Sequence, residues 1–145
     1  MRAFIITIIT AVFLAFGCSK QQRDPNPIAG SWIAEIEAIG EHGHSGFAVL
    51  ALHHEGGTRA NATLTRGSAG GTHPWHIHEG TCDEGGDIVG DPDAYPLLRP
   101  DASGDASATV LIPIALSLDA EYSVRLHQAP DDDTLVGCGE LVSTL

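Results

Sequence analysis

Short runs of alternating apolar and polar residues, separated by glycine-rich turns, fill the chain from Gly30 onward. Trp32 and Ile36 alternate with Glu35, as on a strand whose successive side chains point to opposite faces. The same pattern predicts further strands at 47–53, 58–65, 73–79, 106–116, 121–127 and 136–142. Seven or eight short strands at this spacing, without a helical period, predict one all-β domain. We expect an antiparallel β-sandwich or flattened barrel.

One connection, residues 80–104, is much longer than the others. Pairs such as Gly85-Gly86 and Asp91-Pro92 interrupt regular structure within it. A loop of this length inside a compact domain is usually functional or disordered. In the following strand, Pro113 predicts a sheet edge or a strand end, because proline has no backbone N–H to donate.

The start of the chain has the layout of a secretory signal peptide. Arg2 precedes an apolar run at 4–16 that is shorter than the roughly 20 residues a membrane span needs. The small residue before Cys18 predicts a bacterial lipoprotein signal with Cys18 lipidated, and ordinary secretion is the alternative. The predicted boundaries are 1–17 for the signal peptide, 18–28 for a polar, proline-rich tether, and 29–145 for the β-domain.

If Cys18 carries lipid, two cysteines remain, Cys82 and Cys138. Export places them in an oxidising compartment, where an even pair most simply forms a disulfide. The alternative is two free, buried thiols.

The formal charge is −12 at pH 7. A surface this acidic repels nucleic acid, favours solubility, and slows an anionic substrate unless local cations correct the field. The sequence has neither a phosphate-cradling glycine loop nor a basic patch. It therefore predicts no nucleotide site and no nucleic-acid partner.

The segment from His73 to Cys82 holds three histidines, a tryptophan and a cysteine in ten residues. On an extended strand His76 and His78 share one face, while Trp75 points to the other. Such a strand can pack into a core and still present two imidazoles to a metal ion, since imidazole is the commonest metal ligand.

Three segments, in this order, resemble the copper/zinc superoxide dismutase family and related small secreted domains, some called chordin-like. They are His-Ile-His-Glu-Gly-Thr-Cys at 76–82, Val-Arg-Leu-His at 124–127, and Cys-Gly at 138–139. The resemblance covers about residues 45–141 and implies an eight-stranded Greek-key barrel. It further implies that His76, His78 and His127 are copper ligands and that Cys82 and Cys138 form the family's disulfide.

The chain departs from that family at its zinc site. In the family, the loop after the first cysteine carries a bridging histidine, further zinc-binding histidines and an aspartate. Here residues 82–103 contain no histidine. The aspartates that remain, Asp83, Asp87, Asp91, Asp93 and Asp101, suit zinc poorly without His or Cys partners. The sequence therefore predicts one copper ion and no zinc.

A second departure concerns the arginine that the family places three residues before its second cysteine. Leu135 occupies that position here. Arg125, two residues before His127 on the same predicted strand face, is a candidate anion guide in its place, and a solvated charge is the alternative. The histidine segment also departs after His78, where Gly80 follows one residue sooner than in the dismutases.

The leader and Cys18 predict an exported protein, lipid-anchored to a bacterial membrane and facing the periplasm or the cell surface. The resemblance implies that it would bind one copper ion and react with superoxide. One alternative is a copper-binding or copper-buffering lipoprotein without turnover. The other is a metal-free β-sandwich that binds a partner.

The remaining histidines have separate predictions. His73 is a candidate fourth ligand because Pro74 can bend the chain, and a simple loop histidine is the alternative. The pairs His42/His44 and His53/His54 lie in or beside turns and are predicted to be solvated. Weak copper recruitment by these pairs is the alternative.

Overall fold

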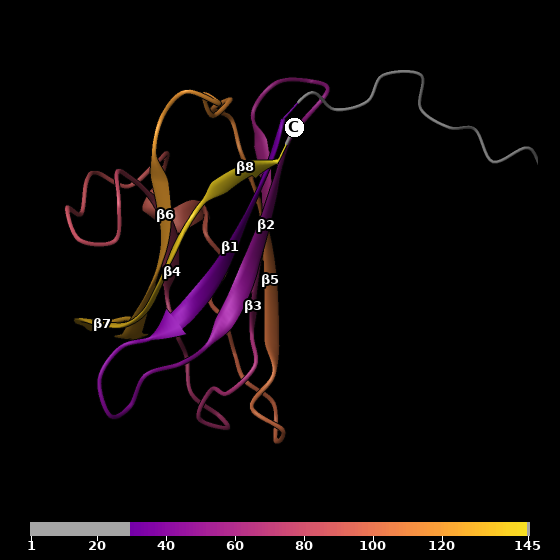
Figure 1. Ribbon diagram of the computed structural model, residues 1–145. Coiled ribbons are helices and arrows are strands. Elements are labelled where there is room, and N and C mark those ends of the chain that lie inside the picture. Colours follow the sequence, from indigo (N-terminus) through magenta and orange to yellow (C-terminus); the bar gives the residue numbers. More distant parts are fainter. Residues whose placement is uncertain (1–29, 145) are drawn as a thin grey trace, which may run out of the picture.

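The computed structural model describes residues 30–144, which form one curled antiparallel sheet of eight strands (Figure 1). The strands are β1 (Ser31–Ala38), β2 (Gly46–Leu52), β3 (Thr58–Leu64), β4 (Trp75–Glu79), β5 (Ala106–Ile112), β6 (Tyr122–Ala129), β7 (Asp132–Glu140) and β8 (Val142–Thr144). Their order is β4-β6-β7-β1-β2-β3-β5, with β8 beside β1. The β3–β4 and β5–β6 connections cross between the two halves of the sheet, as Greek-key connections do.

The predicted all-β class and the number of strands are confirmed. The predicted signal peptide, the lipidated Cys18 and the tether 18–28 lie outside the described residues. The one helix in the described part of the chain is a 3₁₀ turn, Pro92–Ala94, so no helix there is long and apolar enough to cross a membrane.

The core lies between the two halves of the curled sheet, with β4, β6 and β7 on one side and β1, β2, β3 and β5 on the other (Figure 1). Alternation along β1, β2, β3 and β5 sends every second side chain inward, as the sequence pattern predicts. The largest fully buried hydrophobic side chains are Trp32, Trp75, Ile36, Leu50, Leu64, Ile77, Leu98, Ile112, Leu126 and Val124. The buried indole N–H of Trp75 donates a hydrogen bond to the Pro96 carbonyl at 2.8 Å.

Several strand ends differ from the predicted ones. β4 begins at Trp75, immediately after Pro74, and β5 ends at Ile112, immediately before Pro113. The predicted last strand, 136–142, is in fact two strands that break at Leu141. The Leu141 N–H donates to the Tyr122 carbonyl at 2.8 Å. The chain then continues as β8, which pairs with β1.

The long loop after β4 is ordered along the free edge of that strand. Isolated bridges pair His73 with Leu98 and His78 with Ile88. Val89 N–H donates to the Ile77 carbonyl at 2.8 Å. The loop also inserts Val89, Tyr95 and Leu98 into the core. Its position beside β4 brings its backbone to the histidines of that strand.

Candidate metal centre

Two adjacent strands bring His76, His78 and His127 together. His76 and His78 lie on β4, and His127 lies on β6, where its N–H donates to the Pro74 carbonyl at 2.9 Å. One ligand nitrogen from each residue lies within 4.8 Å of the other two. Opposite ligands of an ion bound at about 2.0 Å lie about 4 Å apart, so the three rings can hold one metal ion after a small adjustment.

Backbone carbonyls fix which nitrogen of the His78 and His127 rings carries the proton. His78 Nδ1 lies 2.9 Å from the Gly86 carbonyl, and His127 Nδ1 lies 3.1 Å from the Asp133 carbonyl. A carbonyl can only accept, so the facing ring nitrogen is protonated. The other nitrogen of each ring is left with its lone pair free for a metal.

Two ring nitrogens of the cluster are buried without a partner. His76 Nδ1 and His78 Nε2 have no hydrogen bond, and almost no surface of either atom is open to solvent. Buried polar atoms in folded proteins nearly always have a partner, so an unpaired buried atom calls for an explanation. A metal ion bound between these nitrogens and His127 supplies the missing partner, and the three residues therefore fit a metal centre.

The same burial keeps the ligands neutral. Burial lowers the pKa of His76 to about 4, and the neighbouring His127 and His78 add to the effect. Burial also lowers the pKa of His78, and the positive charge of Arg125 acts in the same direction. Imidazole binds metals only in its neutral form, so these two rings are ready to bind at neutral pH and below.

This pKa shift predicts acid sensitivity of the metal-free protein. Unfolded His76 takes up a proton near pH 6.5, whereas folded His76 does so only near pH 4. Between these values only the unfolded state gains the proton, so stability is full above pH 6.5 and falls as pH drops toward 4. Over this range we expect His76 to lower the free energy of unfolding by about 2 kcal/mol. A fully buried ring with this pKa shift would lower it by about 3 kcal/mol, and the partial exposure of His76 reduces that value.

Urea unfolding at pH 7, 5.5 and 4 measures this loss, with the wild type compared with His76→Ala. The decline should be about 2 kcal/mol smaller in the variant. The exposed His42→Ala is the matched control and should follow the wild type. If the stability of the wild type and of His76→Ala falls in parallel with pH, the lowered pKa of His76 is not the cause of the acid sensitivity.

A surface cavity of about 300 Å³ opens over the cluster. Besides the three histidines, its lining residues are Pro74, Ile88, Ala129, Pro130 and Asp133. One side of the cluster is therefore accessible to a small molecule from solvent, and Asp133 is the one acidic residue that lines the cavity.

Arg125 anchors the loop that follows β4. Its Nη2 donates to the Thr81 carbonyl at 3.2 Å and to the Cys82 carbonyl at 2.8 Å. Gly85 allows this close fit, because a Cβ there would lie 2.6 Å from the guanidinium. The guanidinium does not line the cavity described above. Its positive charge adds to burial, the larger cause, in lowering the pKa of His78.

The structure joins Cys82 and Cys138 in a disulfide, which resolves the choice between a disulfide and free thiols. The bond ties the loop after β4 to β7, across a sequence separation of 56. A buried structural disulfide is typical of proteins that fold in an oxidising compartment.

His73 lies beside the metal centre but outside it. Its ring is 2 % exposed, and its Nδ1 lies 3.3 Å from the His127 carbonyl. It packs edge-to-face on His44, with ring centroids 4.5 Å apart. The structure therefore does not bring the candidate fourth ligand into the cluster of His76, His78 and His127.

The prediction that His44 is solvated is wrong. The residue is 4 % exposed, its N–H donates to the Val136 carbonyl at 2.9 Å, and its Nδ1 lies 3.1 Å from the Arg66 carbonyl. Sequence reasoning also missed the carbonyls of Gly86 and Asp133, which have no side-chain signal. No protein-family model matches the chain, and no curated protein matches it.

Proposed function

We propose that this chain is an exported protein that binds one copper ion through His76, His78 and His127. The observation that carries the proposal is the pair of buried, unpartnered nitrogens on His76 and His78, close to a ligand nitrogen of His127. Three neutral imidazoles suit copper well. Copper also heads the affinity order of first-row divalent ions, so it would outcompete zinc for the same donors.

The export part of the proposal rests on two features of the chain. One is the apolar leader that ends at Cys18, and the other is the disulfide between Cys82 and Cys138. Lipidation at Cys18 would keep the copper centre at a membrane surface. Metabolic labelling with a fatty acid tests this, and Cys18→Ala should abolish the label.

A second candidate function is the dismutation of superoxide to dioxygen and hydrogen peroxide, with uptake of two protons. The cavity over the cluster favours it, because one side of the histidine set is open to a small anion. Bound copper would supply the one-electron redox couple that this reaction needs. The three neutral imidazoles would hold the ion, and the carbonyls of Gly86 and Asp133 would keep two of those rings oriented.

The charges of the chain oppose rapid dismutation. Asp133 lines the cavity, and the net charge is −12. Both repel an anion, whereas Arg125 is bonded to loop carbonyls behind the site. We therefore expect the rate to rise with added salt, because salt screens the repulsion over a Debye length of about 8–10 Å at physiological strength.

The test of both functions is a copper titration followed by a dismutation assay on the loaded protein. We expect one tightly bound copper per chain, and its loss in His78→Ala. For dismutation, the wild type should exceed both His78→Ala and an equal amount of free copper. Tight copper binding with no rate above free copper would leave copper binding as the function and exclude dismutation. Equal copper binding by wild type and His78→Ala would overturn the site itself.

A further inference from the structure

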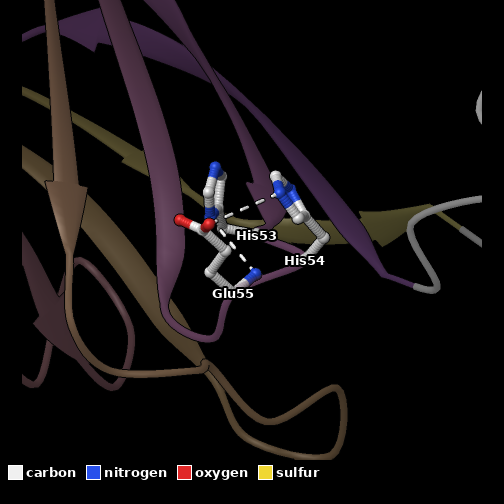
Figure 2. Close-up of polar contacts among 3 residues, drawn as sticks. All are labelled: His53, His54 and Glu55. Atoms are coloured by element: carbon white, nitrogen blue, oxygen red, sulfur yellow. Dashed lines mark hydrogen bonds and ion pairs between the residues drawn. The ribbon is translucent and has the colours of Figure 1, made fainter.

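The turn between β2 and β3 holds a second group of metal-ligating side chains. His53, His54 and Glu55 follow β2 directly, and one ligand atom from each lies within 4.8 Å of the other two. Figure 2 shows the Glu55 carboxylate folded back toward the two imidazole rings. This group lies in the turn after β2, whereas the histidines of the proposed copper centre lie on β4 and β6.

The turn holds these three residues in place through its backbone. His53 N–H donates to the Gly57 carbonyl at 3.0 Å, and Gly56 N–H donates to the His53 carbonyl at 2.9 Å. Gly56 and Gly57 have φ values of 93° and 85°, which favour glycine because it has no Cβ. The ligand atoms therefore project from a closed hairpin, which lowers the entropy lost when they gather around an ion.

The side chains already lie close to a chelating arrangement. The His53 and His54 rings have centroids 4.4 Å apart, and His54 Nε2 lies 4.0 Å from Glu55 Oε1. His53 Nδ1 accepts a hydrogen bond from the Glu55 N–H at 3.4 Å, so this nitrogen carries a lone pair (Figure 2). A long, weak bond of this kind is readily exchanged for a metal–nitrogen bond.

We propose that His53, His54 and Glu55 form a second, exchangeable site for a first-row divalent ion, with Cu(II) bound most tightly. Two imidazoles and a carboxylate suit copper, nickel and zinc, and the affinity order of these ions places copper first. The side chains of His54 and Glu55 are 68 % and 77 % exposed, so the ion keeps water ligands and exchanges with solvent. The net charge of −12 further raises the local concentration of cations.

This site goes beyond the proposed function and does not depend on it. The histidine centre is more buried, opens to solvent on one side and has three nitrogen donors, whereas the turn is more exposed and has two nitrogens and one oxygen. The turn is thus suited to collecting ions from solvent, and the buried centre is suited to retaining one.

The test is a calorimetric titration of the purified, disulfide-bonded protein with Ni(II) and, separately, with Cu(II). We expect two classes of site. His53→Ala/His54→Ala should weaken the second class by at least about tenfold and leave the first unchanged. Glu55→Gln, which keeps the shape and removes the charge, should weaken the second class by a smaller factor. These residues are largely exposed, so the variants should fold as the wild type does.

His42→Ala is the matched control, because this exposed histidine lies in another turn. His76→Ala/His78→Ala/His127→Ala separates the two proposals, since it should lose the first class of site and keep the second. The turn site would be overturned if the second class of site kept its affinity in His53→Ala/His54→Ala. It would also be overturned if His42→Ala weakened that class as much as His53→Ala/His54→Ala does. Loss of only the tight class in the triple variant would support both proposals.

As a second readout, a small amount of Cu(II) should selectively broaden the amide NMR signals of Gly56, Gly57 and Thr58. This broadening should disappear in His53→Ala/His54→Ala. Broadening that is confined to other exposed histidines would contradict the proposal.

Discussion

Replacing Cys82 and Cys138 together with alanine should lower the free energy of unfolding by about 4 kcal/mol. The disulfide spans 56 residues, so it restricts a large part of the unfolded chain, and the stabilisation expected from a cross-link grows with the length of the loop. Cys138 is 5 % exposed, and alanine leaves no unpaired polar atom at that buried position. Urea unfolding with a linear extrapolation measures the loss.

Wild-type protein unfolded in the presence of a strong reductant is the control for this change. It should match the double variant, because both lack the cross-link. A single Cys82→Ala variant should be no more stable than the double one. A loss below about 1 kcal/mol in the double variant would show that the bond restrains the chain far less than its loop length implies.

Saturation with copper should raise the stability of the folded protein by about 4 kcal/mol when free copper is a thousandfold above its dissociation constant. The ion binds a site that exists only in the folded state, so its binding energy adds to the stability. For a domain of this size the shift in melting temperature should be about 15 °C. Differential scanning calorimetry with and without copper measures it.

The triple variant His76→Ala/His78→Ala/His127→Ala should lose this shift. His53→Ala/His54→Ala should keep most of it, because an exchangeable surface site contributes little to the linkage. Magnesium prefers oxygen ligands and should not stabilise either protein. A copper shift that survives in the triple variant would place the stabilising ion elsewhere on the chain.

Much of the fold follows from alternation and from proline. The period of two in residues 32–38 predicts β1, and Pro74 and Pro113 mark where β4 begins and β5 ends. The break between β7 and β8 could not be predicted, because it depends on a hydrogen bond between Leu141 and Tyr122, which are distant in sequence.

The histidine cluster could be predicted in part. Strand alternation places His76 and His78 on one face, and the family resemblance adds His127. The carbonyls that orient the His78 and His127 rings come from the backbone of Gly86 and Asp133, and any residue can supply a carbonyl. Their role depends on the path of the loop, which sequence alone does not specify.

The burial of His44 illustrates the opposite error. A histidine between Gly43 and Ser45 has every local feature of a solvated turn. The carbonyls of Val136 and Arg66 hold it inside instead, and His73 packs against its ring. Contacts between distant parts of the chain override the local preference.

The loop along β4 has a consequence for how this protein behaves at high concentration. β4 is an end strand of the sheet, and such strands invite pairing with other chains through their free N–H and C=O groups. Here Asp87 pairs with Glu79 and Val89 pairs with Ile77, so the loop uses those groups of β4 within the molecule. If the loop is released, as we expect when the disulfide is lost, that edge is uncovered. Self-association into β-rich aggregates should then accompany the loss of the disulfide.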